Sequence, residues 1–98
     1  MKRIKYTIYT ENTPQLRPLL NTYLSGYTIM VGEGRWNDIE EQSAIITYIA
    51  GVADMTVYSL CKRILIDCKQ DSVYLEKQEI ELTEFIKPKE VAYVDAHH

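Results

Sequence analysis

The stretch EEQSAIITYI, residues 40–49, decides the fold because it is apolar on both faces of an extended chain. Successive side chains of a strand point to opposite sides, so Ile45 and Ile49 share one face. The opposite face carries Ala44, Ile46 and Tyr48. A strand of this kind needs cover on both sides. The sequence therefore predicts a sheet whose two faces are both buried around this strand.

Three further segments have the alternation and the β-branched or aromatic content that are typical of strands. Residues 3–10 predict the first strand, residues 27–31 the second and residues 73–76 the fourth. The alternation at residues 80–82 and the apolar run 91–94 predict additional pairing at a sheet edge near the C-terminus.

Two segments have the spacing of amphipathic helices. In the first, Thr13-Pro14 supplies an N-cap and a first helical residue, apolar side chains recur through Leu24, and Gly26 is expected to end the helix. In the second, Asp54 is expected to cap an apolar stripe over residues 57–68.

The resulting order, β-α-β-β-α-β, is the ferredoxin-like arrangement of the α+β class, with two helices on one face of a four-stranded antiparallel sheet. Two helices cover only one face, so other copies of the chain are expected to bury the open face, and a cyclic trimer with ligand clefts between subunits does this naturally. We interpret residues 1–98 as one domain with a core at about 2–78, an extension at 79–96, and a purification-tag remnant at 97–98.

Composition excludes several partners. The 98 residues carry a net charge of -3, and their Lys and Arg are scattered, which disfavours nucleic acid. Apolar runs are too short for a membrane span, and no signal-type segment follows the first residues. Cys61 and Cys68 are seven apart in an expected helix, too far to bridge, which favours a reducing, cytoplasmic setting.

Catalytic chemistry of the common kinds also lacks its residues. The two histidines are His97 and His98, no CxxC or HExxH motif occurs, and no serine or cysteine has a histidine partner in the body of the domain. The sequence therefore predicts no metal site, no nucleophile triad and no cofactor.

The segment from Gly32 to Asp38 is the most unusual, because it combines two glycines with Arg35 and the single tryptophan, Trp36. A phosphate cradle needs a helix N-terminus behind it, and here a strand follows. One interpretation is a hairpin loop whose glycines take positive φ, with Trp36 packed as a lid or at an interface. The other is an indole that stacks on a planar or cationic ligand.

Three polar residues are candidates for a site. Glu40 and Glu41 point to opposite faces of a strand, so at most one enters a site, and Glu41 ends a largely apolar stripe. A solvated strand end is the alternative for Glu41. Gln70 taken alone is a turn residue between the second helix and the fourth strand. The eight tyrosines suit wet interfaces.

Residues 34–46, GRWNDIEEQSAII, and residues 69–75, KQDSVYL, resemble two strands of the phage-encoded S-adenosylmethionine lyases. Those strands carry the patterns Glu-Glu-x-[Ser/Thr] and Gln-Asp-x-Val. The two stretches also resemble a bacterial family with a Gly-x-Trp, Glu-x-Ser, Gln-x-Ser-Val pattern. The similarity spans roughly Gly26 to Gln78, about half of the chain.

The resemblance implies a trimer with a fold like that of the PII signalling proteins and active sites between subunits. These lyases cleave S-adenosylmethionine into methylthioadenosine and homoserine lactone, because the substrate's own carboxylate attacks its γ-carbon. By resemblance, Glu41 and Gln70 are the catalytic residues, and Ser43 belongs to the same substrate site. Trp36 and Tyr27 are the candidates for the aromatic contact, although neither aligns with the family tyrosine.

Three functions follow as hypotheses. The first is a trimeric S-adenosylmethionine lyase, located in the host cytoplasm if phage-encoded. The second is a non-enzymatic PII-like module that binds or sequesters a nucleotide-like small molecule between subunits. The third is a structural oligomer whose aromatic residues only mediate assembly.

Overall fold

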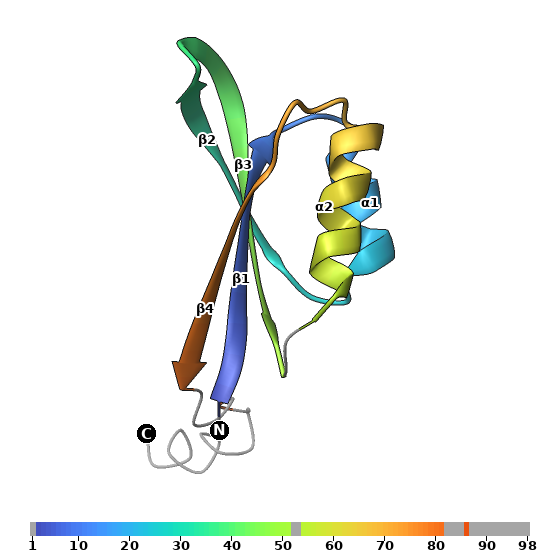
Figure 1. Ribbon diagram of the computed structural model, residues 1–98, viewed down its shortest axis with the longest axis vertical. Coiled ribbons are helices and arrows are strands. Elements are labelled where there is room, and N and C mark those ends of the chain that lie inside the picture. Colours follow the sequence, from blue (N-terminus) through green and yellow to red (C-terminus); the bar gives the residue numbers. More distant parts are fainter. Residues whose placement is uncertain (1, 52–53, 82–85, 87–98) are drawn as a thin grey trace, which may run out of the picture.

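The computed structural model describes residues 2–51, 54–81 and 86. It contains one antiparallel sheet in the order β2-β3-β1-β4, with both helices on one face (Figure 1). The expected ferredoxin-like α+β fold is confirmed. In chain order the elements are β1 Lys2–Glu11, α1 Leu16–Tyr23, β2 Thr28–Trp36, β3 Ile39–Ala50, α2 Thr56–Asp67 and β4 Tyr74–Glu81.

The predicted C-terminal pairing is met in part. β4 continues to Glu81, and Ile80 pairs with Arg3 of β1. Leu82, residues 91–94 and residues 97–98 lie outside the described residues. Among the residues that are described, no helix is long and apolar enough to cross a membrane.

The core lies between the sheet and the helices. Alternate residues of the two central strands point toward the helices, as the period-two pattern predicted, and Tyr6 and Tyr48 stack with ring centroids 5.3 Å apart. Full burial of one large aliphatic side chain in this core stabilises the fold by about 1.5–3 kcal/mol. The fully buried large side chains are Tyr6, Ile8, Leu16, Leu20, Ile46, Val57, Leu60 and Ile64.

Helix α1 is shorter than predicted at both ends. It begins at Leu16 instead of Pro14, and Gln15 occupies the N-cap without a side-chain bond. Pro18 is the third helical residue. Its missing N–H costs little there, because the N–H groups of the first turn of a helix have no intrahelical acceptor. The helix ends at Tyr23 because Leu24 is extended, so Gly26 does not terminate it.

Helix α2 begins beside Asp54, as expected. The carboxylate of Asp54 accepts a 2.8 Å hydrogen bond from the backbone N–H of Thr56, and its own N–H donates to the Tyr6 hydroxyl at 2.9 Å. This second hydrogen bond connects the start of the helix to Tyr6, a buried residue of β1. Cys61 and Cys68 are both free thiols.

The hydroxyl of Tyr48 is buried without a hydrogen-bond partner among the described residues. Burial, and then the charge of Asp54, raise the pKa of Tyr48 above its ordinary value of 10.0. The folded state therefore holds this proton more tightly than the unfolded state, and the resulting stability is present below about pH 10 and is lost at higher pH.

Tyr48→Phe is therefore expected to raise the free energy of unfolding by about 1 kcal/mol at pH 7, because it removes an unpaired buried group. The variant should also lose less stability between pH 10 and pH 11. Burial raises the pKa of Cys61 to about 11, so some alkaline loss should remain. Urea titrations of both proteins at pH 7 and between pH 10 and pH 11 check these two points. Identical changes of stability with pH in the variant and the wild-type chain would contradict the assignment to Tyr48.

The other face of the sheet carries apolar side chains that neither helix covers. Ile49 is 44% exposed there and Met30 65%, while Ile45 is half-buried. The two-sided apolar pattern of the third strand is thus confirmed, with one side packed on the helices and the other open in the single chain. We call Met30, Ile45 and Ile49 the open-face cluster.

Candidate functional site

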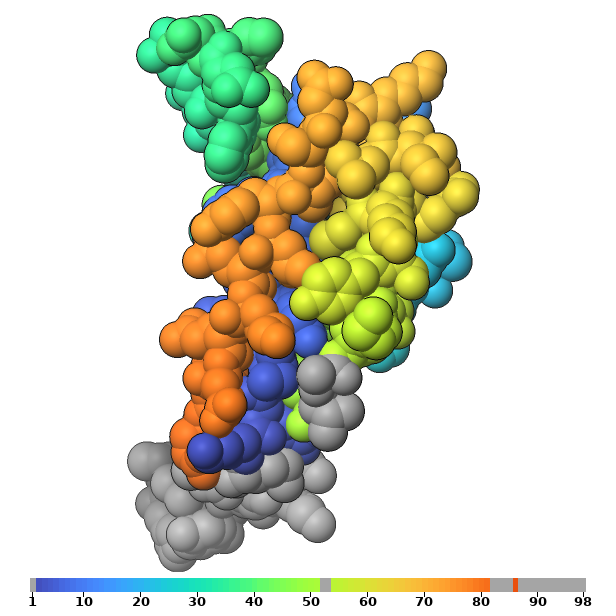
Figure 2. All heavy atoms as spheres, viewed as in Figure 1, coloured from blue at the N-terminus to red at the C-terminus, as the bar shows by residue number. Residues whose placement is uncertain are grey.

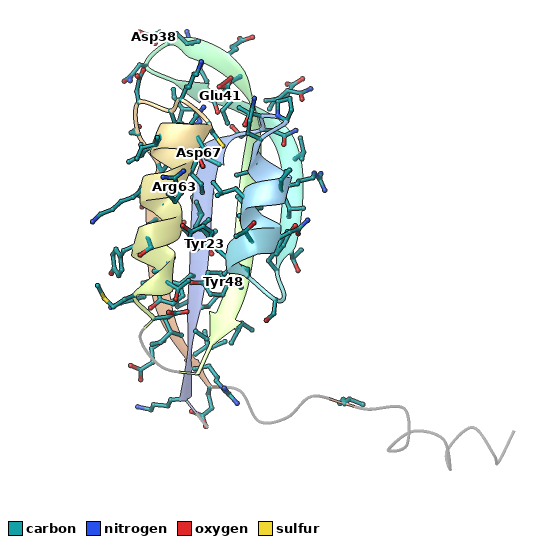
Figure 3. All side chains as sticks on the ribbon, turned by 90° about the vertical axis from the view of Figure 1, so that its right-hand side faces the viewer. Tyr23, Asp38, Glu41, Tyr48, Arg63 and Asp67 are labelled. Carbon is teal, nitrogen blue, oxygen red and sulfur yellow. The ribbon has the colours of Figure 1, made fainter. Side chains whose placement is uncertain are left out.

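The segment from Gly32 to Asp38, which was predicted as a loop, belongs to a β-hairpin. We call its end, residues 32–43, the hairpin arm. β2 and β3 pair up to Trp36 and Ile39, so the turn has only two residues, Asn37 and Asp38, at φ 50° and 64°. Two successive positive φ values are characteristic of the tight turns that match strand twist. The expected positive-φ glycines are therefore wrong: the two glycines extend the strand. Asp38 lies at the far tip of the arm (Figure 3).

One face of this arm holds a short hydrogen-bond chain. The indole N–H of Trp36 donates to Ser43 Oγ at 3.5 Å, and the Ser43 hydroxyl donates to Glu41 Oε2 at 3.3 Å. A Cβ on Gly34 would collide with Ser43 Oγ and lie 3.2 Å from the indole nitrogen. The glycine is therefore needed to let these three side chains meet.

Gly34→Ala is expected to displace Ser43, break its bond with Trp36, and lower the free energy of unfolding by about 1–3 kcal/mol. Gly32→Ala is the matched control, since a Cβ there meets nothing within 4 Å. Because Trp36 is the only tryptophan, its fluorescence reports directly on the arm. Equal spectra and equal urea midpoints for the two variants would contradict the steric role of Gly34.

Gln70 is placed by the end of α2. Lys69 takes φ 53°, and the Gln70 N–H donates to the carbonyl of Leu65 at 3.1 Å, which together form a Schellman-type helix end. The Gln70 side chain then reaches the end of β1. Its Nε2 donates to Glu11 Oε1 at 3.1 Å and to the Cys68 carbonyl at 2.9 Å, while its Oε1 accepts the Glu11 N–H at 3.3 Å.

A cleft of about 250 Å³ lies between the hairpin arm and the segment after α2, residues 69–72. Figure 2 shows it as a hollow between the green arm and the orange segment. The end of β1 contributes to its lining. The lining residues are Tyr9, Thr10, Glu11, Trp36, Asn37, Ile39, Glu40, Glu41, Lys69, Gln70, Asp71, Ser72 and Tyr74.

The cleft is acidic and aromatic. Its lining contains four carboxylates, from Glu11, Glu40, Glu41 and Asp71, against one lysine. This charge favours a ligand with a cationic group over one with several phosphates. Within the described part of the chain, no three His, Cys, Asp or Glu side chains are grouped to hold a metal ion.

Tyrosine rings add to the lining. Tyr9 and Tyr74 have ring centroids 5.4 Å apart. The pKa of Tyr9 is raised, mainly because its hydroxyl donates a hydrogen bond to the carboxylate of Glu76. Desolvation of Tyr9 and the negative charge of Glu76 raise it further. Tyr9 and Tyr74 therefore add an aromatic surface to the acidic lining.

The structure brings together four of the five residues singled out from sequence. Glu41, Gln70 and Trp36 line the cleft. Ser43 lies behind them and donates a hydrogen bond to Glu41. Tyr27 lies near the other end of β2, where its hydroxyl donates to Asn21 Oδ1 at 2.6 Å.

Sequence reasoning did not find Glu11, Tyr9 or Tyr74. Glu11 faces Ser43, and Tyr9 faces Tyr74, across neighbouring strands. Register between distant strands was the missing signal, because neither residue lies in a motif of its own.

No known protein family matches this sequence, and no curated protein does. Solved structures do resemble it. CPII, a nitrogen regulatory PII-like protein from Thiomonas intermedia K12, bound to ADP, AMP and bicarbonate, matches at 21% identity with a TM-score of 0.60, over 88% of this chain and 98% of CPII.

Two other structures resemble the chain. A DUF3240 family protein from Shewanella baltica has a TM-score of 0.62 at 11% identity, over 87% of this chain and 97% of its own. A putative PII-like signalling protein from Thermus thermophilus has 0.56 at 16% identity, over 85% and 90%. Such low identities establish architecture alone. The four-stranded sheet with its two helices therefore has the fold of the PII-like signalling proteins.

Proposed function

We propose that this chain is a PII-like module that assembles as a homotrimer and binds a nucleoside-bearing small molecule in the cleft beside the hairpin arm. The observation that carries the proposal is that Gln70, from a separate part of the sequence, lines the same cleft as Trp36 and Glu41 of the hairpin arm. The aromatic rings offer faces for a planar base, and the carboxylates offer acceptors for its polar groups.

Assembly is the second part of the proposal. The open-face cluster supports it, because apolar side chains on a sheet face are stabilised when another copy covers them. In a cyclic trimer the neighbouring chain would provide a further wall for each cleft. The structural likeness to CPII, which was solved with ADP and AMP, adds support for a nucleotide-like ligand.

Thermal unfolding with and without ligand tests this function. Adenosine diphosphate, adenosine monophosphate and S-adenosylmethionine are each titrated while sedimentation measures the mass. We expect a trimer that S-adenosylmethionine stabilises, by about 2.7 kcal/mol at 100 times the dissociation constant. A lone protomer in dilute buffer, or no stabilisation by any of the three compounds, would reject the proposal.

A second candidate is S-adenosylmethionine lyase activity in the same cleft. The observation that favours it is the acidic lining, which suits a sulfonium and an ammonium group better than a polyphosphate. Glu41 would hold the substrate's ammonium group. The adenine ring would stack on Trp36 or a tyrosine of the cleft.

The reaction itself requires only that the substrate be folded correctly. A carboxylate oxygen of the substrate attacks its own γ-carbon, the bond from that carbon to sulfur breaks, and the electron pair leaves with the sulfur. The products are neutral methylthioadenosine and homoserine lactone. The main contribution of the protein is then orientation of the reacting atoms.

Chromatography of a reaction mixture distinguishes this candidate from simple binding. Methylthioadenosine formed above the spontaneous rate supports the lyase. Stabilisation by S-adenosylmethionine without product supports the binding module instead.

A further inference from the structure

We propose that Glu11 is a ligand-contacting carboxylate of the cleft, and that Gln70 is a positioning residue that holds Glu11 without touching the ligand. This inference rests on the proposed function. It reassigns Gln70, which the family resemblance implied as a catalytic residue, and it adds Glu11, which no motif indicated.

The hydrogen bonds of Gln70 carry the first step. Its Nε2 donates to Glu11 Oε1 and to the Cys68 carbonyl, and its Oε1 accepts the Glu11 N–H. A glutamine amide has two donor hydrogens, and both are engaged here, while its oxygen already accepts one of the two hydrogen bonds that it can take. A ligand acceptor could reach this amide only if one of the two bonds from Nε2 broke, which favours a positioning role for Gln70.

The carboxylate of Glu11 carries the second step. Gln70 holds it at Oε1, and Oε2 accepts no hydrogen bond from any described residue. Glu11 lines the cleft and pairs with Ser43 across the β1–β3 ladder. Its second oxygen is therefore available to a ligand in the cleft.

Glu41 is held in the same way on the adjacent strand. The Ser43 hydroxyl donates to Glu41 Oε2 at 3.3 Å. Ser43 and Gln70 are neutral donors, so each orients a carboxylate without cancelling its charge. Two oriented carboxylates on neighbouring strands fit a ligand with a positively charged group, since hydrogen bonds between ionised partners are roughly twice as strong as neutral ones.

A double-mutant cycle tests the roles, with S-adenosylmethionine as the probe and adenosine diphosphate as the phosphate-bearing comparison. The variants are Glu11→Gln, Gln70→Ala and the double substitution. Glu11→Gln removes the charge but keeps an acceptor for Gln70, so the fold is retained. Gln78→Ala, an exposed glutamine on β4 away from the cleft, is the control for amide truncation.

We expect Glu11→Gln to weaken S-adenosylmethionine binding about 10-fold or more, and Gln70→Ala to weaken it by no more than that. The double variant should bind no more weakly than Glu11→Gln alone, because Gln70 acts through Glu11. The affinity for adenosine diphosphate should not fall in Glu11→Gln. Gln78→Ala should bind like the wild-type chain.

Two results would overturn the inference while leaving the proposed function intact. Losses that multiply in the double variant would mean that Gln70 contacts the ligand itself, and an unchanged affinity in Glu11→Gln would remove Glu11 from the site. A wild-type chain that binds neither compound would instead overturn the proposed function, and this inference with it.

Discussion

Replacing Glu41 with glutamine is expected to weaken S-adenosylmethionine binding roughly 10- to 100-fold, the loss typical of a hydrogen bond to a charged group. Glu41 lines the cleft, and Ser43 fixes one of its carboxylate oxygens. Figure 3 places it on the arm, between the tip at Asp38 and the level of the helices. The amide in the variant keeps the shape of the side chain but not its charge. Calorimetric titration measures the change.

Glu33→Gln is the matched control for Glu41. It makes the same change of charge on the same hairpin arm, but Glu33 does not line the cleft between the arm and the segment after α2. The control should bind within about twofold of the wild-type chain, because exposed charges contribute little. Equal losses in the two variants would assign the effect to the net charge of the arm. If the lyase candidate is correct, Glu41→Gln should also remove methylthioadenosine formation.

Ile49→Asp is expected to convert the proposed trimer into single chains. Ile49 belongs to the open-face cluster and is already 44% exposed, so the substitution changes the stability of one chain only modestly. In an assembly that covers this face, the new carboxylate would be buried without a partner, at a cost of about 3 kcal/mol or more per subunit contact. Analytical ultracentrifugation measures the mass, and binding to the cleft should fall with it.

Ile66→Asp is the control for assembly. It replaces the same residue type at an exposed site, 64% accessible on α2, away from the open face. This variant should sediment like the wild-type chain. A trimer that survives Ile49→Asp would show that the open face is not the subunit contact, and the cleft would then lose the wall assigned to a neighbouring chain.

The correct predictions of the fold came from patterns that short-range physics sets. Alternation in residues 3–10 and 40–49 matches the pleat of a strand, and the two helices follow from their apolar stripes. Helix ends were less predictable. Proline at position 14 allowed an earlier start, and the structure instead uses the Pro14-Gln15 pair as a turn before Leu16.

The hairpin arm shows why a local pattern misled. Two glycines within three residues usually mark a loop, but here the space above Gly34 is filled by Ser43 from the paired strand. The partner side chain comes from nine residues further along. A glycine that relieves a cross-strand collision and a glycine that enables a turn are identical in sequence.

The amino-acid sequence alone determined the order of strands and helices, the two-sided apolar character of β3, and the identity of Glu41, Gln70 and Trp36 as candidates. Only the tertiary structure decided that these residues share one cleft, that Glu11 joins them, and that both amide hydrogens of Gln70 are already engaged. The reason is physical. Periodicity depends on neighbours along the chain, whereas a site depends on strand register and on hydrogen bonds between residues as much as 59 positions apart.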